Sequence, residues 1–241
     1  MAWASFNEGL TCTTDNFVQK SGFQRYASEH RVAVVNPDTS PRVRIDGDDE
    51  DASYGQSASF YVDATAEPWA RHYQMYTYIV GELLPLVFDN FPVDRARCGI
   101  FGHSMGGHGA ITIGLRNPTL FKSISAFAPI CCASTSTWGR RAFAQYFGAA
   151  AADNNNHAQY DALTVALAYS GPRRVIHVDQ GAADEFFERG DLHPGRLIDA
   201  ESEALRVDLN VHEGYDHSYF FVATFMESHF RFHVSTWATS T

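Results

Sequence analysis

The stretch Cys98-Gly-Ile-Phe-Gly-His-Ser-Met-Gly-Gly-His-Gly109 decides the fold. Residues 98–102 predict a buried strand that enters a glycine-rich turn, and residues 105–116 predict a helix that ends at Asn117-Pro118. Between them Gly102-His-Ser-Met-Gly106 matches the pattern G-x-S-x-G, in which a serine occupies a sharp strand-to-helix turn. Glycines let strand and helix approach closely, and the helix N-terminus favours developing negative charge. We therefore predict Ser104 to be a nucleophile, although it could instead be an ordinary helix cap.

Short apolar runs and helical patterns alternate on both sides of this stretch. Strands are predicted over 31–36, 123–129, 174–179 and 207–211, and helices over 73–91, 194–205 and 219–234. The segments 46–58 and 149–157 are predicted loops. Alternating strands and helices favour a mostly parallel sheet with helices on both faces. We expect a single α/β domain over residues 1–241, with the α/β-hydrolase fold.

A nucleophilic serine needs a histidine base and an acid that orients it, and in this fold the order is serine, acid, histidine. Asp184 follows the strand predicted at 174–179, and His217 follows the strand at 207–211. Order and placement both fit a catalytic triad. Three other carboxylates are alternatives for the acid, namely Asp179, Asp191 and Asp216.

Other histidines have less specific interpretations. His103 and His108 flank the sharp turn at Ser104, the nucleophile elbow, and are predicted either to be packing residues or to support the catalytic groups from behind. His229 and His233 lie on the closing helix and are predicted to be on its surface.

Acyl transfer also requires donors for the oxyanion. One is usually the backbone N–H after the nucleophile, which here is Met105. The second should come from a loop after an early strand, and the turn Gly9-Leu-Thr-Cys12 makes the Leu10 N–H the candidate.

Composition excludes several classes of protein. A net charge of −10 over 241 residues, with scattered Lys and Arg, argues against nucleic-acid binding. No apolar run is long enough to suggest a membrane span. The adjacent pair Cys131–Cys132 lacks zinc-site spacing, and four cysteines in a chain of this length indicate reduced, cytoplasmic thiols. We expect neither metal nor organic cofactor in the reaction.

Segments spread over nearly the whole chain, in order, resemble S-formylglutathione hydrolase, the esterase D family. They are Gly9–Thr13, Lys20–Gly22, Ala27–His30, Pro37–Pro41, Phe60–Thr65, Asn90–Asp94, Phe101–Ala110, Ser125–Ile130, Trp138–Gly139, Asp179–Gly181 and Glu213–Tyr219. The resemblance implies a cytoplasmic thioesterase, frequently a homodimer, that hydrolyses S-formylglutathione to glutathione and formate in formaldehyde detoxification.

The resemblance also assigns residues. It implies Ser104, His217 and Asp184 as the triad and the N–H groups of Leu10 and Met105 as the oxyanion hole. Two further positions match residues of the family's active site. Cys12 matches a thiol that often makes these enzymes sensitive to thiol reagents, and Trp138 matches a tryptophan near the acyl pocket.

The chain departs from the family pattern in two places. The family carries several dozen more residues before Gly9-Leu-Thr-Cys12, including an antiparallel pair of edge strands. The strand at 32–35 is therefore expected at an open edge. Glu8 stands where the family usually has Ser. Ser57 and Ser59 replace glycines and Ala52 replaces a tryptophan, so strain is expected wherever those glycines have positive φ.

These departures keep two other functions open. One is a general esterase for short acyl groups that has lost glutathione recognition, favoured by the altered loop at 52–59. The other is a weakly active paralogue or binding module, favoured by the short N-terminus. The thioesterase and the general esterase would both act on a small-molecule thioester or ester. The sequence does not define the partner of a binding module.

Overall fold

The computed structural model describes residues 1–48, 52–148 and 157–239. Its centre is a six-stranded sheet in the order β2-β1-β3-β4-β5-β6, in which every adjacent pair is parallel. The strands are β1 Ala2–Asn7, β2 Val32–Val35, β3 Cys98–His103, β4 Ser123–Phe127, β5 Arg174–Gly181 and β6 Leu205–His212. The predicted α/β fold is confirmed.

The first residues of the chain form an inner strand. β1 lies between β2 and β3, with Trp3 opposite Cys98 and Phe6 opposite Phe101. All residues of β1 and β3 are buried, as expected for strands covered on both faces. β2 ends the described sheet and pairs only with β1 there, which confirms the predicted edge position of 32–35.

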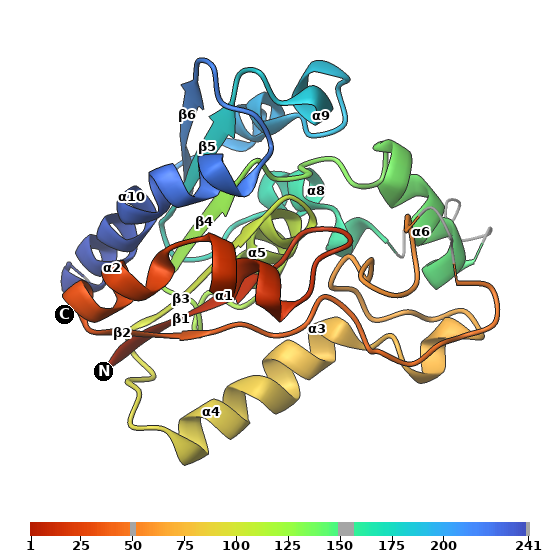
Figure 1. Ribbon diagram of the computed structural model, residues 1–241, viewed down its shortest axis with the longest axis horizontal. Helices are drawn as coiled ribbons and strands as arrows, with labels where there is room; N and C mark the ends of the chain where they lie inside the picture. The colour runs from red at the N-terminus through yellow and green to blue at the C-terminus, as the bar shows by residue number, and fades with distance from the viewer. Residues whose placement is uncertain (49–51, 149–156, 240–241) are drawn as a thin grey trace.

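Helices cover both faces of the sheet (Figure 1). The alternating side chains of β4 identify the helices on each face. Ser123 and Ser125 face α10 (Tyr219–Ala238), where their hydroxyls contact His233. Ile124 points the opposite way, toward Gly114 of α5. α1 (Thr14–Lys20) and α2 (Phe23–His30) pack beside α10, and α8 (Ala162–Leu167) packs on α5.

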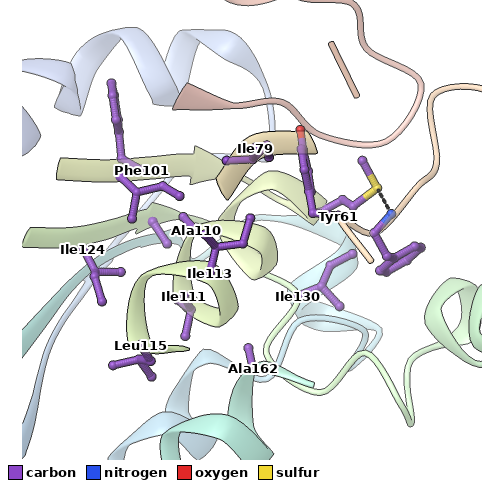
Figure 2. Packing of buried hydrophobic residues seen from close by; sticks show 14 of the residues in the cluster. Tyr61, Ile79, Phe101, Ala110, Ile111, Ile113, Leu115, Ile124, Ile130 and Ala162 are labelled. Atoms are coloured by element: carbon purple, nitrogen blue, oxygen red, sulfur yellow. Dashed lines mark hydrogen bonds between the residues drawn. The ribbon is translucent and has the colours of Figure 1, made fainter. Parts of the chain in front are cut away.

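The helix α5 (Met105–Arg116) has the bounds that the sequence predicts, and all of it except Arg116 is buried. Figure 2 shows its apolar side chains between the sheet and α8, among them Ala110, Ile111 and Ile113. A helix that is apolar on nearly every side must be an internal one. The helix α5 therefore runs through the interior of the molecule from its start at the elbow.

The segment predicted as one helix over 73–91 is helical but not uniform. It consists of α3 (Met75–Thr77), a wider π-helical stretch η2 (Tyr78–Leu83) and α4 (Leu84–Asn90). Pro85 explains the widening, because it has no N–H for the carbonyl of Gly81 and its ring displaces that carbonyl.

The segment predicted as a helix over 194–205 is also shorter. A 3₁₀-helix, η4, covers Pro194–Ala200, and Leu205 already belongs to β6.

The remaining elements are short helices in the connections between strands. They are η1 Trp69–Arg71, α6 Thr137–Phe147, η3 Ala158–Tyr160 and α9 Glu185–Glu188. The predicted loop at 46–58 has no helix or strand in its described residues, and most of the predicted loop at 149–157 lies outside the described residues. Within the described part of the chain, no helix is long and apolar enough to cross a membrane.

Candidate active site

Ser104 occupies a strained turn between β3 and α5. Its backbone has φ 59° and ψ −118°, a conformation that costs energy for a residue with a side chain. The turn is held by the Ser104 N–H, which donates to the Phe127 carbonyl at 2.9 Å, and by the Ser104 carbonyl, which accepts from the Ile130 N–H at 3.2 Å. Ser104 is thus fixed at the N-cap position of α5, but its side chain makes no capping hydrogen bond, unlike that of an ordinary helix cap.

Glycines make this turn sterically possible. A Cβ atom on Gly102 would lie 2.3 Å from the Gly106 carbonyl oxygen, and one on Gly106 would lie 1.9 Å from the Asn7 carbonyl oxygen. Both distances are far below any allowed contact. The spacing of the G-x-S-x-G motif therefore follows from backbone packing of β1, β3 and α5.

Asp184 and His217 come together beside the elbow. The Asp184 Oδ2 lies 2.6 Å from His217 Nδ1 and accepts a second hydrogen bond from the Gln180 side chain at 2.9 Å. Its Oδ1 caps α9 by accepting from the Phe186 N–H. Burial would raise the pKa of the Asp184 carboxyl, but the hydrogen bond and charge of His217 outweigh it, so the pKa is lowered. The carboxylate is suited to orient the imidazole.

The three alternative carboxylates have other partners in the described structure. Asp191 accepts from the Thr137 N–H, and Asp216 accepts from the N–H and hydroxyl of Ser218. Asp179 accepts from histidines of β6 and α10. Asp184 is the candidate that contacts His217.

The loop after β1 approaches the serine from the other side. A Cβ on Gly9 would lie 3.3 Å from the Ser104 Cβ, so only a small residue fits there comfortably. Leu10 follows directly and lines the same pocket as Ser104. Met105 is the first residue of α5, and its N–H is among those at a helix start that have no partner within the helix. The residues that carry the two predicted oxyanion donors thus adjoin Ser104, Leu10 by lining the same pocket and Met105 by following Ser104 in the chain.

A cavity of about 300 Å³ contains these groups. Ser104, His217, Leu10 and the predicted pocket residues Cys12 and Trp138 all line it. Phe186, which no sequence motif indicated, forms part of the same wall and meets Trp138 edge to face at 5.1 Å between ring centroids. The Arg189 guanidinium lies over both rings, 5.5 Å from the Trp138 centroid and 4.9 Å from that of Phe186.

Burial makes Cys12 a weak acid. Loss of solvent around the thiol raises its pKa to about 12, and the nearby Glu8 carboxyl adds to the shift. The thiol is therefore placed in the pocket as the resemblance implies, but its thiolate form is scarce at neutral pH.

Glu8 is a fully buried carboxyl next to the oxyanion loop, another feature whose role the sequence left open. One oxygen accepts from the Phe17 N–H at 2.5 Å, and the other accepts a short hydrogen bond from the Tyr219 hydroxyl. Burial outweighs these hydrogen bonds and raises the pKa of Glu8 from 4.5 to about 7. The contact joins the oxyanion loop to the start of α10, two residues after His217.

The altered loop shows strain at some of its substituted positions. Ser57 has φ 64° and Ala52 has φ 57°, so the expected strain is confirmed at Ser57 and is present at Ala52 as well. Ser59 is not in the left-handed region, and its hydroxyl instead bonds the Thr39 carbonyl and the Tyr61 N–H. The Ser57 carbonyl accepts from the Thr11 N–H at 3.1 Å, which ties this loop to the oxyanion loop.

His103 and His108 are both buried, and His103 also lines the active-site cavity. The His103 ring lies 4.5 Å from that of His217, and burial holds its pKa well below the usual range. His108 packs edge to face on Phe60, and burial lowers its pKa to about 4.

The prediction that His229 and His233 lie on the helix surface is wrong. Both are buried on the face of α10 that meets the sheet. His229 bonds Ser125 and Asp179, and His233 bonds Ser123 and Ser125, so strand hydroxyls and a carboxylate satisfy the imidazoles. A polar partner on the sheet makes burial of these histidines possible.

Sheet order, elbow and buried helix define an esterase with the α/β-hydrolase fold. Residues 5–232 match the family model of esterases described as "Putative esterase". The chain is 49% identical over 227 residues to an S-formylglutathione hydrolase of Mus musculus, covering 93% of this chain and 79% of that protein. It is 46% identical to one of Paracoccus denitrificans, with the same coverage. The chain belongs to the S-formylglutathione hydrolase family.

Comparison with solved structures gives the same family and fold. An S-formylglutathione hydrolase from Agrobacterium tumefaciens superimposes with a TM-score of 0.90 at 43% identity, over 97% of this chain and 83% of that one. FphF, a serine hydrolase of Staphylococcus aureus, superimposes with a TM-score of 0.72 at 19% identity, over 97% of this chain and 84% of that one, and so shares the fold.

Proposed function

We propose that this chain hydrolyses S-formylglutathione to glutathione and formate, with Ser104 as nucleophile, His217 as general base and Asp184 as the acid that orients it. One observation carries the proposal: a serine on a strained elbow shares a pocket with a histidine whose Nδ1 lies 2.6 Å from a buried carboxylate. That this occurs in a chain 49% identical to an enzyme of that name supports the substrate.

The first half of the reaction forms a formyl-enzyme. His217 Nε2 takes the proton of the Ser104 hydroxyl while Oγ bonds to the formyl carbon. Negative charge moves to the carbonyl oxygen, where the N–H groups of Leu10 and Met105 stabilise it. The carbon–sulfur bond then breaks, and the glutathione sulfur leaves with the proton that His217 gives back.

The second half releases formate. His217 takes a proton from water while the water oxygen attacks the formyl carbon bound to Ser104. The bond between carbon and Oγ breaks, and His217 returns the proton to Oγ. Throughout, Asp184 holds the Nδ1 proton of His217 and stabilises the imidazolium.

The test is the rate of S-formylglutathione hydrolysis by the purified chain and by Ser104→Ala. The Ser104→Ala rate is expected to fall by on the order of 10⁴-fold or more. Ser170→Ala, at an exposed serine outside the pocket, is the matched control and should keep full activity. Slow hydrolysis by folded wild-type chain, or an active Ser104→Ala variant, would refute the proposal.

The alternatives are separated by a second substrate and a probe. A general esterase would hydrolyse p-nitrophenyl acetate at least as efficiently as S-formylglutathione, whereas the proposed enzyme should strongly prefer the thioester. A non-catalytic module would not be labelled at Ser104 by a fluorophosphonate.

We also propose a cytoplasmic location. All four cysteines are free, three of them buried, which suits a reducing compartment. Cell fractionation with an antibody against the chain tests this, and recovery from the secreted fraction would contradict it.

A further inference from the structure

A second cluster of chemically capable side chains lies between β5 and α10, apart from Ser104, His217 and Asp184. His177 and Asp179 are two residues apart on β5 and so point to the same face of the sheet. His229 reaches them from α10. All three are buried, and one ligand atom of each lies within 4.8 Å of those of the others.

The two distances from Asp179 Oδ2 to the imidazole nitrogens fit a metal ion. Asp179 Oδ2 lies 3.1 Å from His229 Nε2 and 3.5 Å from His177 Nε2. In a tetrahedral site with ligand distances near 2.0 Å, adjacent ligand atoms are about 3.3 Å apart. Two imidazoles and one carboxylate are a donor set that suits zinc and neighbouring transition metals.

Outer partners orient both imidazoles as they do in metal sites. Asp208 Oδ2 lies 2.7 Å from His177 Nδ1, and Ser125 Oγ lies 2.8 Å from His229 Nδ1. A carboxylate on the far nitrogen of a ligating histidine fixes the tautomer and makes the near nitrogen a better ligand. His177 thus presents Nε2 to the centre of the cluster.

His177 Nε2 is also a buried atom with no hydrogen bond in the described structure. If Nδ1 donates to Asp208, the Nε2 lone pair faces the carboxylate of Asp179, and two electron-rich atoms oppose each other. A cation between them removes this conflict. The Oδ1 atom of Asp179 is held by His212 Nε2 at 3.0 Å. The Oδ2 atom accepts from Ser228 Oγ at 3.2 Å and contacts His229 Nε2 at 3.1 Å, so a bound ion would take the place of the hydrogen bond between Oδ2 and His229.

We propose that His177, Asp179 and His229 bind one divalent transition-metal ion, with Zn²⁺ the best-fitting. The side chains of Asp208 and His212 are partly exposed, so the cluster lies near the surface along β6. Water would complete the coordination. The ion would join β5 to α10, and its role is structural.

The experiment titrates the chelator-treated full chain with Zn²⁺ in competition with a chromogenic chelator, and repeats the titration with Co²⁺ followed by visible absorption. We expect one ion per chain and the intense visible bands of tetrahedral Co²⁺. His177→Gln should weaken binding at least as much as the roughly 10- to 100-fold that loss of an outer partner costs. His72→Gln removes an exposed histidine outside the cluster and should leave the affinity unchanged.

Asp208→Asn keeps the test decisive if His177→Gln does not fold, because the Asp208 side chain is 56% exposed. It should weaken Zn²⁺ binding by about 10- to 100-fold. Asp199→Asn, at a carboxylate of similar exposure outside the cluster, should not. The proposal would be overturned if wild type did not bind Zn²⁺, or if wild type, His177→Gln and Asp208→Asn bound it with equal affinity. His177 would then be interpreted as an imidazolium held between two carboxylates.

Discussion

Replacing Glu8 by glutamine should change how the stability of the protein depends on pH. The carboxyl is fully buried, and its pKa rises from 4.5 to about 7 on folding. Glutamine keeps an oxygen that accepts from the Phe17 N–H, and its amide group is placed to bond the Tyr219 hydroxyl. The substitution therefore removes the charge and preserves the shape.

The sign follows from proton linkage. Because the folded state holds the proton more tightly, the contribution of Glu8 to stability is fully present below pH 4.5 and is lost as pH rises to about 7. A shift from 4.5 to 7 corresponds to about 3 kcal/mol at 1.36 kcal/mol per pKa unit. Wild type should lose about that much unfolding free energy across this range from Glu8, and Glu8→Gln should not.

The assay is urea unfolding followed by tryptophan fluorescence at intervals from pH 4.5 to 8. At pH 8 the Glu8→Gln variant should be more stable than wild type by up to about 3 kcal/mol, and the difference should vanish near pH 4.5. Glu203→Gln, at an exposed glutamate, is the control and should run parallel to wild type. Parallel curves for Glu8→Gln and wild type would show that the buried carboxyl does not take up a proton on folding.

Three further outcomes are expected. With its pKa raised from 9.0 to about 12, Cys12 should react with iodoacetamide at pH 7.5 roughly 30- to 60-fold more slowly than an ordinary thiol, measured by mass spectrometry; faster labelling would contradict its burial. Arg189→Ala should raise the KM for S-formylglutathione about 5-fold and leave that for p-nitrophenyl acetate unchanged, because the half-exposed guanidinium lies over the pocket wall, where it can pair with a glutathione carboxylate in addition to Asp191, its partner at 3.2 Å; equal effects on both substrates would refute this. Gly106→Ala should destabilise the fold by about 4 kcal/mol or more in urea, because its Cβ would lie 1.9 Å from the Asn7 carbonyl oxygen, whereas Gly195→Ala, with open space around it, should have little effect.

The sequence was sufficient for the features that depend on local chain geometry. The strand, turn and helix around Ser104 follow from apolar runs and glycines that are adjacent in the chain, and α5 has the predicted bounds. Asp184 and His217 were candidates from chain order, because loops after parallel strands open at the same edge of the sheet. Chain order alone left three other carboxylates as alternatives to Asp184, and the family resemblance made the choice.

What the sequence left unclear depends on partners that are distant in the chain. His229 and His233 are four residues apart, a spacing that suits an exposed helix face as well as a buried one. Their burial depends on hydroxyls of β4 about a hundred residues earlier, Ser123 and Ser125. Similarly, the environment of Glu8 depends on Tyr219, which no local pattern connects to it.

The position of β1 has a consequence for how the protein is made. Its outer partner β2 begins at Val32, but its inner partner β3 begins only at Cys98. During synthesis at about 5–20 residues per second, the apolar strand around Trp3 must wait on the order of 5–20 s before the partner that buries it exists. Such long-range parallel pairing slows folding and leaves a nascent chain open to wrong contacts. Folding yield should therefore be sensitive to translation rate and to chaperones that shield the first strand.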